Sequence, residues 1–106
     1  MKRPEFVTIG PFTYEIYYSN EAVTEDMGKT DWVNRKITIW PSIDETVVKE
    51  TLFHEIEHVV LEGVMEAVAA CDLDIYRKEE RLVRLTSPKF FQTFRDNPAV
   101  TKYLFG

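Results

Sequence analysis

Residues 42–64 read SIDETVVKETLFHEIEHVVLEGV, and this stretch decides the fold. Ser42 followed three residues later by Glu45 is a capping box, and Asp44 and Glu45 suit the positive end of a helix dipole. Apolar residues then recur at helical spacing. They form one broad arc that we expect to lie in the core: Val48, Leu52, Phe53, Ile56, Val59 and Val60. The sequence therefore predicts an amphipathic helix over residues 44–64.

The same helix carries the sequence His-Glu-Ile-Glu-His at residues 54–58, nearly opposite the apolar arc. His54 and His58 are four residues apart, so their imidazoles lie one turn apart and can converge on one Zn²⁺. Glu55 lies beside the place where a metal-bound water would be, and a carboxylate there takes the proton and passes it to a leaving amine. Both histidines of the chain belong to this motif. We therefore expect one Zn²⁺ per chain, with Glu55 as the catalytic base.

A catalytic zinc site needs a third protein ligand, and because no other histidine remains, it must be a carboxylate or Cys71. Residues 75–86 are expected to form a second helix, in which Glu80 shares a face with the apolar residues. Glu80 is therefore the expected third ligand, and Glu79 is the alternative. Four basic residues surround the pair: Arg77, Lys78, Arg81 and Arg84. Such a charge cluster is also typical of two carboxylates that are only solvated and bind no metal.

The front of the chain predicts strands, because it is rich in β-branched and aromatic residues. Residues 5–9 and 12–18 flank Gly10-Pro11, which is typical of a tight turn, and so predict a hairpin. Residues 19–31 are polar and predict a loop, and residues 36–40 alternate as a third strand would.

In the back of the chain, Ser87-Pro88 predicts the start of a third helix and Asn97-Pro98 its end. We expect an α+β fold in a single domain over residues 1–106. Its small antiparallel or mixed sheet of about three strands would pack on the motif helix. A second, glutamate-bearing helix and a C-terminal helix would follow.

Composition excludes several classes of protein. The net charge of −5 argues against a nucleic-acid partner, because phosphate binding needs a basic surface. No apolar stretch reaches the roughly 18 residues of a membrane span, and no signal peptide is recognised. The single Cys71 cannot form an internal disulfide, which fits a reducing compartment. We therefore expect a cytoplasmic protein without a membrane span.

In outline the chain resembles the minimal gluzincin metallopeptidases, small proteins similar to the catalytic domains of membrane-embedded metallopeptidases. Residues 54–58 carry the resemblance, and softer matches lie at residues 51–53, 80–83 and 95–98. The resemblance implies His54 and His58 as zinc ligands, Glu80 as the third ligand, and Glu55 as general base and acid.

The same resemblance implies a zinc-dependent endopeptidase that acts on peptides or partly unfolded proteins. It places strand 36–40 at the sheet edge, where an extended peptide would pair with the backbone. Some minimal gluzincins are latent, with C-terminal residues over the cleft. The aromatic tail at residues 103–105 has the composition for that role, and also for ordinary packing in the core.

Two other functions are compatible with the motif. A zinc-stabilised interaction or regulatory protein with little turnover is the alternative, because a domain of this size gains folding energy from bound metal. A purely structural site has no need of Glu55 and prefers a fourth protein ligand, for which Cys71 is the candidate. A zinc amidase or another hydrolase of small molecules is the third class.

Overall fold

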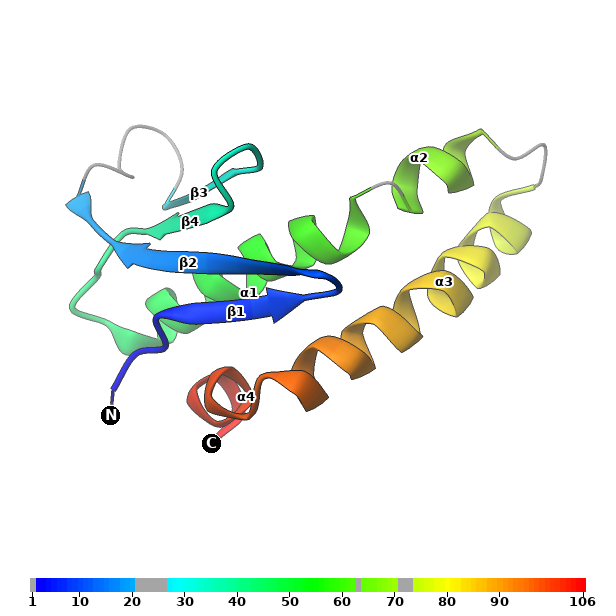
Figure 1. Cartoon of the computed structure of the whole chain (residues 1–106). Helices are drawn as coiled ribbons and strands as arrows, with labels where there is room; N and C mark the ends of the chain where they lie inside the picture. The colour runs from blue at the N-terminus through cyan, green and yellow to red at the C-terminus, as the bar shows by residue number, and fades with distance from the viewer. Residues whose placement is uncertain (1, 21–26, 63, 71–73) are drawn as a thin grey trace.

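The computed structural model describes residues 2–20, 27–62, 64–70 and 74–106. In this part of the chain, a four-stranded mixed sheet lies against the motif helix, which confirms the α+β class (Figure 1). The strand order is β1 (Phe6–Ile9), β2 (Phe12–Tyr18), β4 (Lys36–Ile39) and β3 (Gly28–Asp31). Strands β1 and β2 form the predicted hairpin, β2 and β4 pair in parallel, and β3 pairs antiparallel with β4.

Strand β3 changes which strand lies at the edge of the sheet. The sequence predicts a loop over residues 19–31, but its last four residues form β3, so that part of the prediction is wrong. Gly-Lys-Thr-Asp has low strand propensity, and the pairing with β4 supplies the order that the residues lack by themselves. The expected edge at residues 36–40 is also wrong, because β4 lies between β2 and β3.

Four helices follow in the described residues: α1 (Glu45–Leu61), α2 (Val64–Ala69), α3 (Ile75–Asp96) and α4 (Pro98–Phe105). Helix α1 is the predicted motif helix, with a different cap. Asp44 is its N-cap and accepts a hydrogen bond from the Thr46 N–H at 3.0 Å. Ser42, the predicted cap, lies two residues before Asp44, and its hydroxyl accepts from the Asp44 N–H at 3.1 Å. None of these helices is long and apolar enough to cross a membrane.

Helix α3 runs through Ser87-Pro88, where the sequence predicts that one helix ends and another begins. That prediction is wrong because contacts with α1, α2 and β1 hold α3 along its length. Thr86 and Thr93 are buried on this packed side, and their hydroxyls donate to the carbonyls one turn earlier at 2.7 Å. Local signals for a boundary are thus overridden by tertiary packing.

The core lies between α1 and the sheet, and α4 completes it. Its fully buried side chains include Val7, Ile37 and Ile39 from the sheet, Val48, Leu52 and Ile56 from α1, and Val100 and Tyr103 from α4. Five residues of the predicted arc are buried, and the sixth, Phe53, is half-buried. Tyr103 of the aromatic tail is therefore part of the core and Leu104 packs against it, whereas Phe105 is exposed.

Asn97 covers the outer edge of β1 at Thr8. Its Oδ1 accepts from the Thr8 N–H at 2.7 Å, and its Nδ2 donates to the Thr8 and Thr93 carbonyls, each at 2.6 Å. The carboxamide thus gives Thr8 the two hydrogen bonds that a neighbouring strand would give. Within the described ranges, β3 has no corresponding cover.

Residues from near the two ends of the chain, Arg3 and Tyr103, meet at Glu45 in the first turn of α1. The Glu45 carboxylate accepts from the Arg3 guanidinium, with Nε at 2.9 Å, and from the Tyr103 hydroxyl. The hydrogen bond from Arg3, followed by that from Tyr103, lowers the pKa of Glu45. Burial and the bond to Glu45 raise the pKa of Tyr103 to about 12.

Candidate metal centre

His54 and His58 lie one turn apart on the exposed side of α1, as their spacing predicts. Their Nε2 atoms are 3.0 Å apart, and the two rings are perpendicular. Two nitrogen ligands at about 2.0–2.1 Å from a tetrahedral zinc ion are about 3.4 Å apart. The two imidazoles therefore converge closely enough to fit two positions of a metal centre.

Glu55 is buried beside the histidines, with 6% of its surface exposed. Its Oε2 accepts a hydrogen bond from the Thr30 hydroxyl on β3 at 2.7 Å. The edge strand therefore covers Glu55 and fixes one of its two oxygens. A carboxylate held in this way has a defined orientation, which proton transfer to or from a neighbouring group requires.

Gly28 allows β3 to approach α1 this closely. A Cβ atom at this position would lie 2.9 Å from the Thr51 Cγ2 and 3.1 Å from both Cγ and Oε1 of Glu55. Glycine within a strand often marks such an approach. Gly28 and Thr30 are two residues apart and so lie on the same face of β3; the sequence does not predict either as a residue of this site.

A pocket of about 380 Å³ opens between β3 and α1. Both histidines and Glu55 line it, together with Met27 and Gly28 from the strand side and Glu50 and Thr51 from the helix. All three residues of the motif that the sequence assigns to chemistry thus face one cavity.

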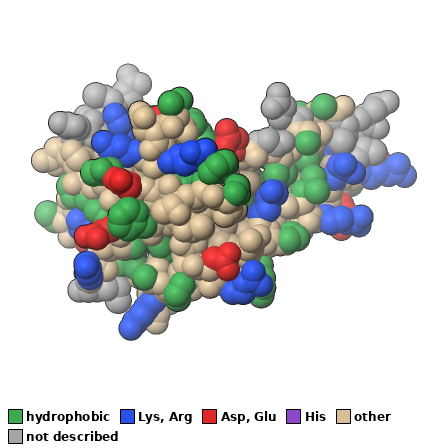
Figure 2. All heavy atoms as spheres, in the orientation of Figure 1, with side chains coloured by type: hydrophobic (Ala, Val, Ile, Leu, Met, Phe, Trp, Pro, Cys, Tyr) green, Lys and Arg blue, Asp and Glu red, His purple; other side chains and the backbone are tan. Residues whose placement is uncertain are grey.

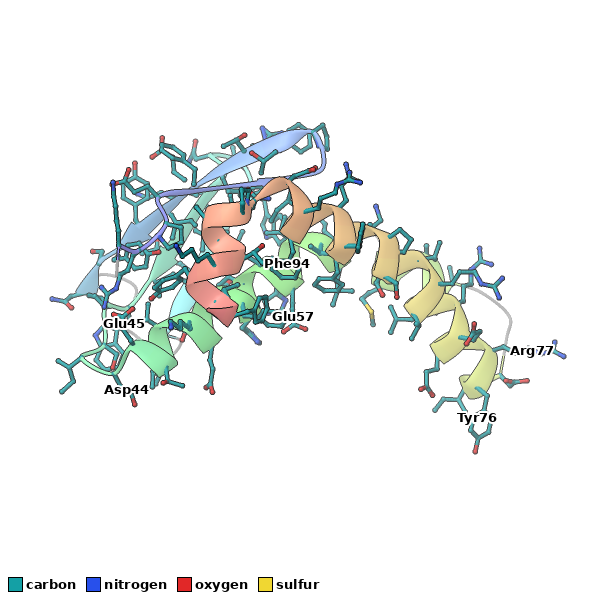
Figure 3. All side chains as sticks on the ribbon, turned by 90° about the horizontal axis from the view of Figure 1, so that it is seen from below. Asp44, Glu45, Glu57, Tyr76, Arg77 and Phe94 are labelled. Atoms are coloured by element: carbon teal, nitrogen blue, oxygen red, sulfur yellow. The ribbon has the colours of Figure 1, made fainter. Side chains whose placement is uncertain are left out.

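The predicted third ligand lies elsewhere. Glu80 is exposed on α3, 3.6 Å from Arg84, and lines a separate surface hollow with Arg77 and Arg81. Figure 3 shows Arg77, in the first turn of α3, at the opposite end of the molecule from Glu45. Figure 2 shows lysine and arginine side chains gathered over this part of α3.

No three His, Cys, Asp or Glu side chains are grouped closely enough to hold a metal, within the residues that the structure describes. Glu79, the alternative ligand, is likewise exposed on α3, and Cys71 falls outside the described residues. The third ligand therefore stays a prediction from the sequence.

No protein-family model, curated protein or solved structure matches this chain.

Proposed function

We propose that this protein is a zinc-dependent endopeptidase that acts on peptides or partly unfolded proteins. The observation that carries the proposal is the convergence of the His54 and His58 Nε2 atoms beside the buried carboxylate of Glu55 at one pocket. One Zn²⁺ would be held by these two histidines and by a third protein ligand. For this ligand Glu80, with Glu79 as the alternative, stays the prediction from the sequence, although both lie on α3, outside this pocket. When bound, the metal polarises a carbonyl and makes water more acidic.

Glu55 is the proposed proton carrier. Thr30 holds its Oε2, which leaves Oε1 to take a proton from water and to deliver it to the leaving amine. Burial under β3 keeps the carboxylate beside the histidines and restricts the access of bulk water. These properties favour a catalytic role over a purely structural zinc site, which has no need of such a group.

The edge strand supports a peptide as the substrate. The Trp40 N–H donates to the Met27 carbonyl at 2.7 Å, so Met27 faces β4. Because bonding directions alternate along an antiparallel ladder, the backbone groups of Gly28 and Thr30 face away from β4. An extended peptide that paired with these groups would pass over the pocket, which favours peptides over small-molecule amides.

The single cysteine supports a cytoplasmic location, because the chain can form no internal disulfide. Latency through the C-terminal tail stays a prediction. In the structure, Tyr103 of the tail is buried in the core, whereas Phe105 and both imidazoles are exposed.

Replacing Glu55 tests the proposal. Glu55→Gln should keep one bound zinc and the thermal stability of the wild type, yet cleave unfolded casein and a peptide library about 10²–10⁴-fold more slowly. Glu62→Gln, which removes an exposed carboxylate at the end of the same helix, is the matched control and should keep full activity.

Two outcomes would contradict the proposal. A zinc-loaded wild type that cleaves no faster than Glu55→Gln would indicate the alternative, a zinc-stabilised interaction protein. Elemental analysis that finds no metal in the wild type after incubation with Zn²⁺, or equal metal in His54→Ala, would remove the metal centre itself.

Zinc affinity also tests the third ligand. Glu80→Gln should weaken zinc binding more than Glu79→Gln does, because a carboxylate ligand is lost in only one of them. The opposite order would assign the ligand to Glu79, and unchanged affinity in both variants would exclude the pair.

A further inference from the structure

A second hollow, of about 440 Å³, lies beside His54 where α1 meets the last residues of α4. We call it the C-terminal groove. Phe53, Leu104 and Phe105 form its apolar walls, and Glu50, His54 and Glu57 lie along its α1 side. Glu50 and His54 also line the pocket of the candidate metal centre, so the two hollows adjoin at these residues.

The apolar walls belong to a cluster of aromatic rings. Phe53 stacks on Phe94 with ring centroids 5.9 Å apart, and Phe105 packs edge-on against both rings, at 5.9 Å and 5.4 Å. Figure 3 shows Phe94 and Glu57 near the junction of α1, α3 and α4. These mutual contacts hold the walls in place although Phe105 is largely exposed.

The charges of the groove favour a cationic ligand. Glu50 and Glu57 have no ion-pair partner in the part of the chain that the structure describes. Lys49 is the one lysine or arginine among the lining residues described, and its Nζ lies 5.2 Å from the centre of the Tyr103 ring. Two carboxylates against one ammonium leave an excess of negative charge next to an apolar surface.

We propose that the C-terminal groove binds the side chain of an arginine or lysine of the substrate, close to the bond that is cleaved. Such a side chain has an apolar stem, which would lie along Phe53 and Phe105, and a cationic end, which Glu57 and Glu50 would attract. The proposal rests on the proposed function, because the peptide over the adjoining pocket places the side chain here. The groove would therefore give the enzyme a preference for substrates with arginine or lysine at this position.

Binding of small probes tests the groove without any cleavage. The whole chain, kept with a chelator, is titrated with N-acetyl-arginine amide and N-acetyl-norleucine amide, and the NMR signals of Phe53 and Phe105 are followed. The arginine probe should bind about fivefold more tightly than the norleucine probe, the scale of one partly exposed ion pair.

Variants of the groove sharpen this test. Glu57→Gln should remove most of the preference for arginine, whereas Glu5→Gln, which removes an equally negative but remote exposed side chain, should keep it. Lys49→Met should strengthen arginine binding, because it removes the competing ammonium, and Phe105→Ala should weaken both probes. Equal binding of the two probes, or a preference that Glu57→Gln leaves intact, would overturn the proposal.

Cleavage separates this inference from the proposed function. Peptides that differ only by arginine, lysine, leucine or glutamate at one position should be cut next to the basic residues by the wild type. Cleavage without that preference would contradict the groove and leave the peptidase standing. If nothing is cleaved, the peptidase fails, and the probe titration alone decides whether the groove binds cations.

Discussion

Gly28 sets the distance between the edge strand and the carboxylate of Glu55. In Gly28→Ala the new methyl group would meet Thr51 and Glu55 at 2.9–3.1 Å, so the strand or the side chains must shift. We expect the free energy of unfolding in urea to fall by about 1–3 kcal/mol, which is the usual cost of overpacking. Activity should fall as well, because the Thr30 hydroxyl moves with the strand.

A second substitution checks that the contact with Thr51 is responsible. Thr51→Ser removes the Cγ2 atom and keeps the hydroxyl, which donates to the Val47 carbonyl at 2.7 Å. The double variant should recover part of the stability that Gly28→Ala loses. Wild-type stability of Gly28→Ala alone would show that β3 does not lie this close to α1.

Single residues could be predicted from the sequence only where helix geometry fixes their relation. The spacing of His54 and His58 determines their convergence, whichever way the rest of the chain folds. Gly28 and Thr30 gain their roles when β3 docks on α1, and nothing within 20 residues of them in sequence signals that contact. Glu80 is predicted from its place on a helix face, and a helix face does not show where the helix lies in the fold.

Among the elements, strand β1 depends on a side chain to complete its hydrogen bonding. Asn97→Ala would leave the Thr8 N–H and carbonyl without their partners in a partly buried place. The free energy of unfolding should fall by about 1–3 kcal/mol, and the Thr8 amide should exchange faster with deuterium. Asn20→Ala, at an exposed position, is the control, and an equal loss in that variant would contradict the role of Asn97.

Helix α3 contains Pro88, which has no N–H and so leaves out one backbone hydrogen bond of the helix. Pro88→Ala restores a donor for the Arg84 carbonyl, so the free energy of unfolding should rise, by as much as about 3 kcal/mol. Ser87→Ala, at the exposed position before it, should change stability by much less. A loss of stability in Pro88→Ala would mean that the proline ring makes contacts that the helix needs.

Elements with strong local patterns were predictable, and those fixed by partners were not. The hairpin follows from Gly10-Pro11 between two β-rich runs, and α1 follows from its apolar arc. The continuation of α3 through Ser87-Pro88, the strand β3 and the position of β4 inside the sheet depend on contacts between distant segments. Such tertiary contacts override the local sequence signals.

For the molecule as a whole, the network of Arg3, Glu45 and Tyr103 makes stability depend on pH at both extremes. The pKa of Glu45 is lowered from 4.5, so its contribution is present above that value and is lost as pH falls through the lower folded value. The pKa of Tyr103 is raised from 10.0 to about 12, so its contribution is present below pH 10 and is lost as pH rises toward 12. Thermal unfolding over this range should show both losses.

Single substitutions separate the loss of stability at low pH from the loss at high pH. Glu45→Gln should reduce the acid loss, and Tyr103→Phe should reduce the alkaline loss but not abolish it, because burial also raises the pKa of Tyr18. Tyr76→Phe, at an exposed tyrosine of α3, should keep the alkaline loss of the wild type. If Tyr103→Phe lost as much stability at high pH as the wild type, the network would not join the two ends of the chain.

The carboxamide at Asn97 also limits how copies of this protein can associate. A sheet with two unpaired edge strands can pair with a further copy at each edge and so form fibres. A sheet with one unpaired edge strand can pair with one further copy only. Over the residues described, the outward N–H and carbonyl of Thr8 in β1 are already bonded to Asn97, whereas β3 has no such cover and can accept a strand. Two copies joined through β3 would saturate each other, so association by strand pairing should stop at a closed pair, and an occupied β3 would prevent even that.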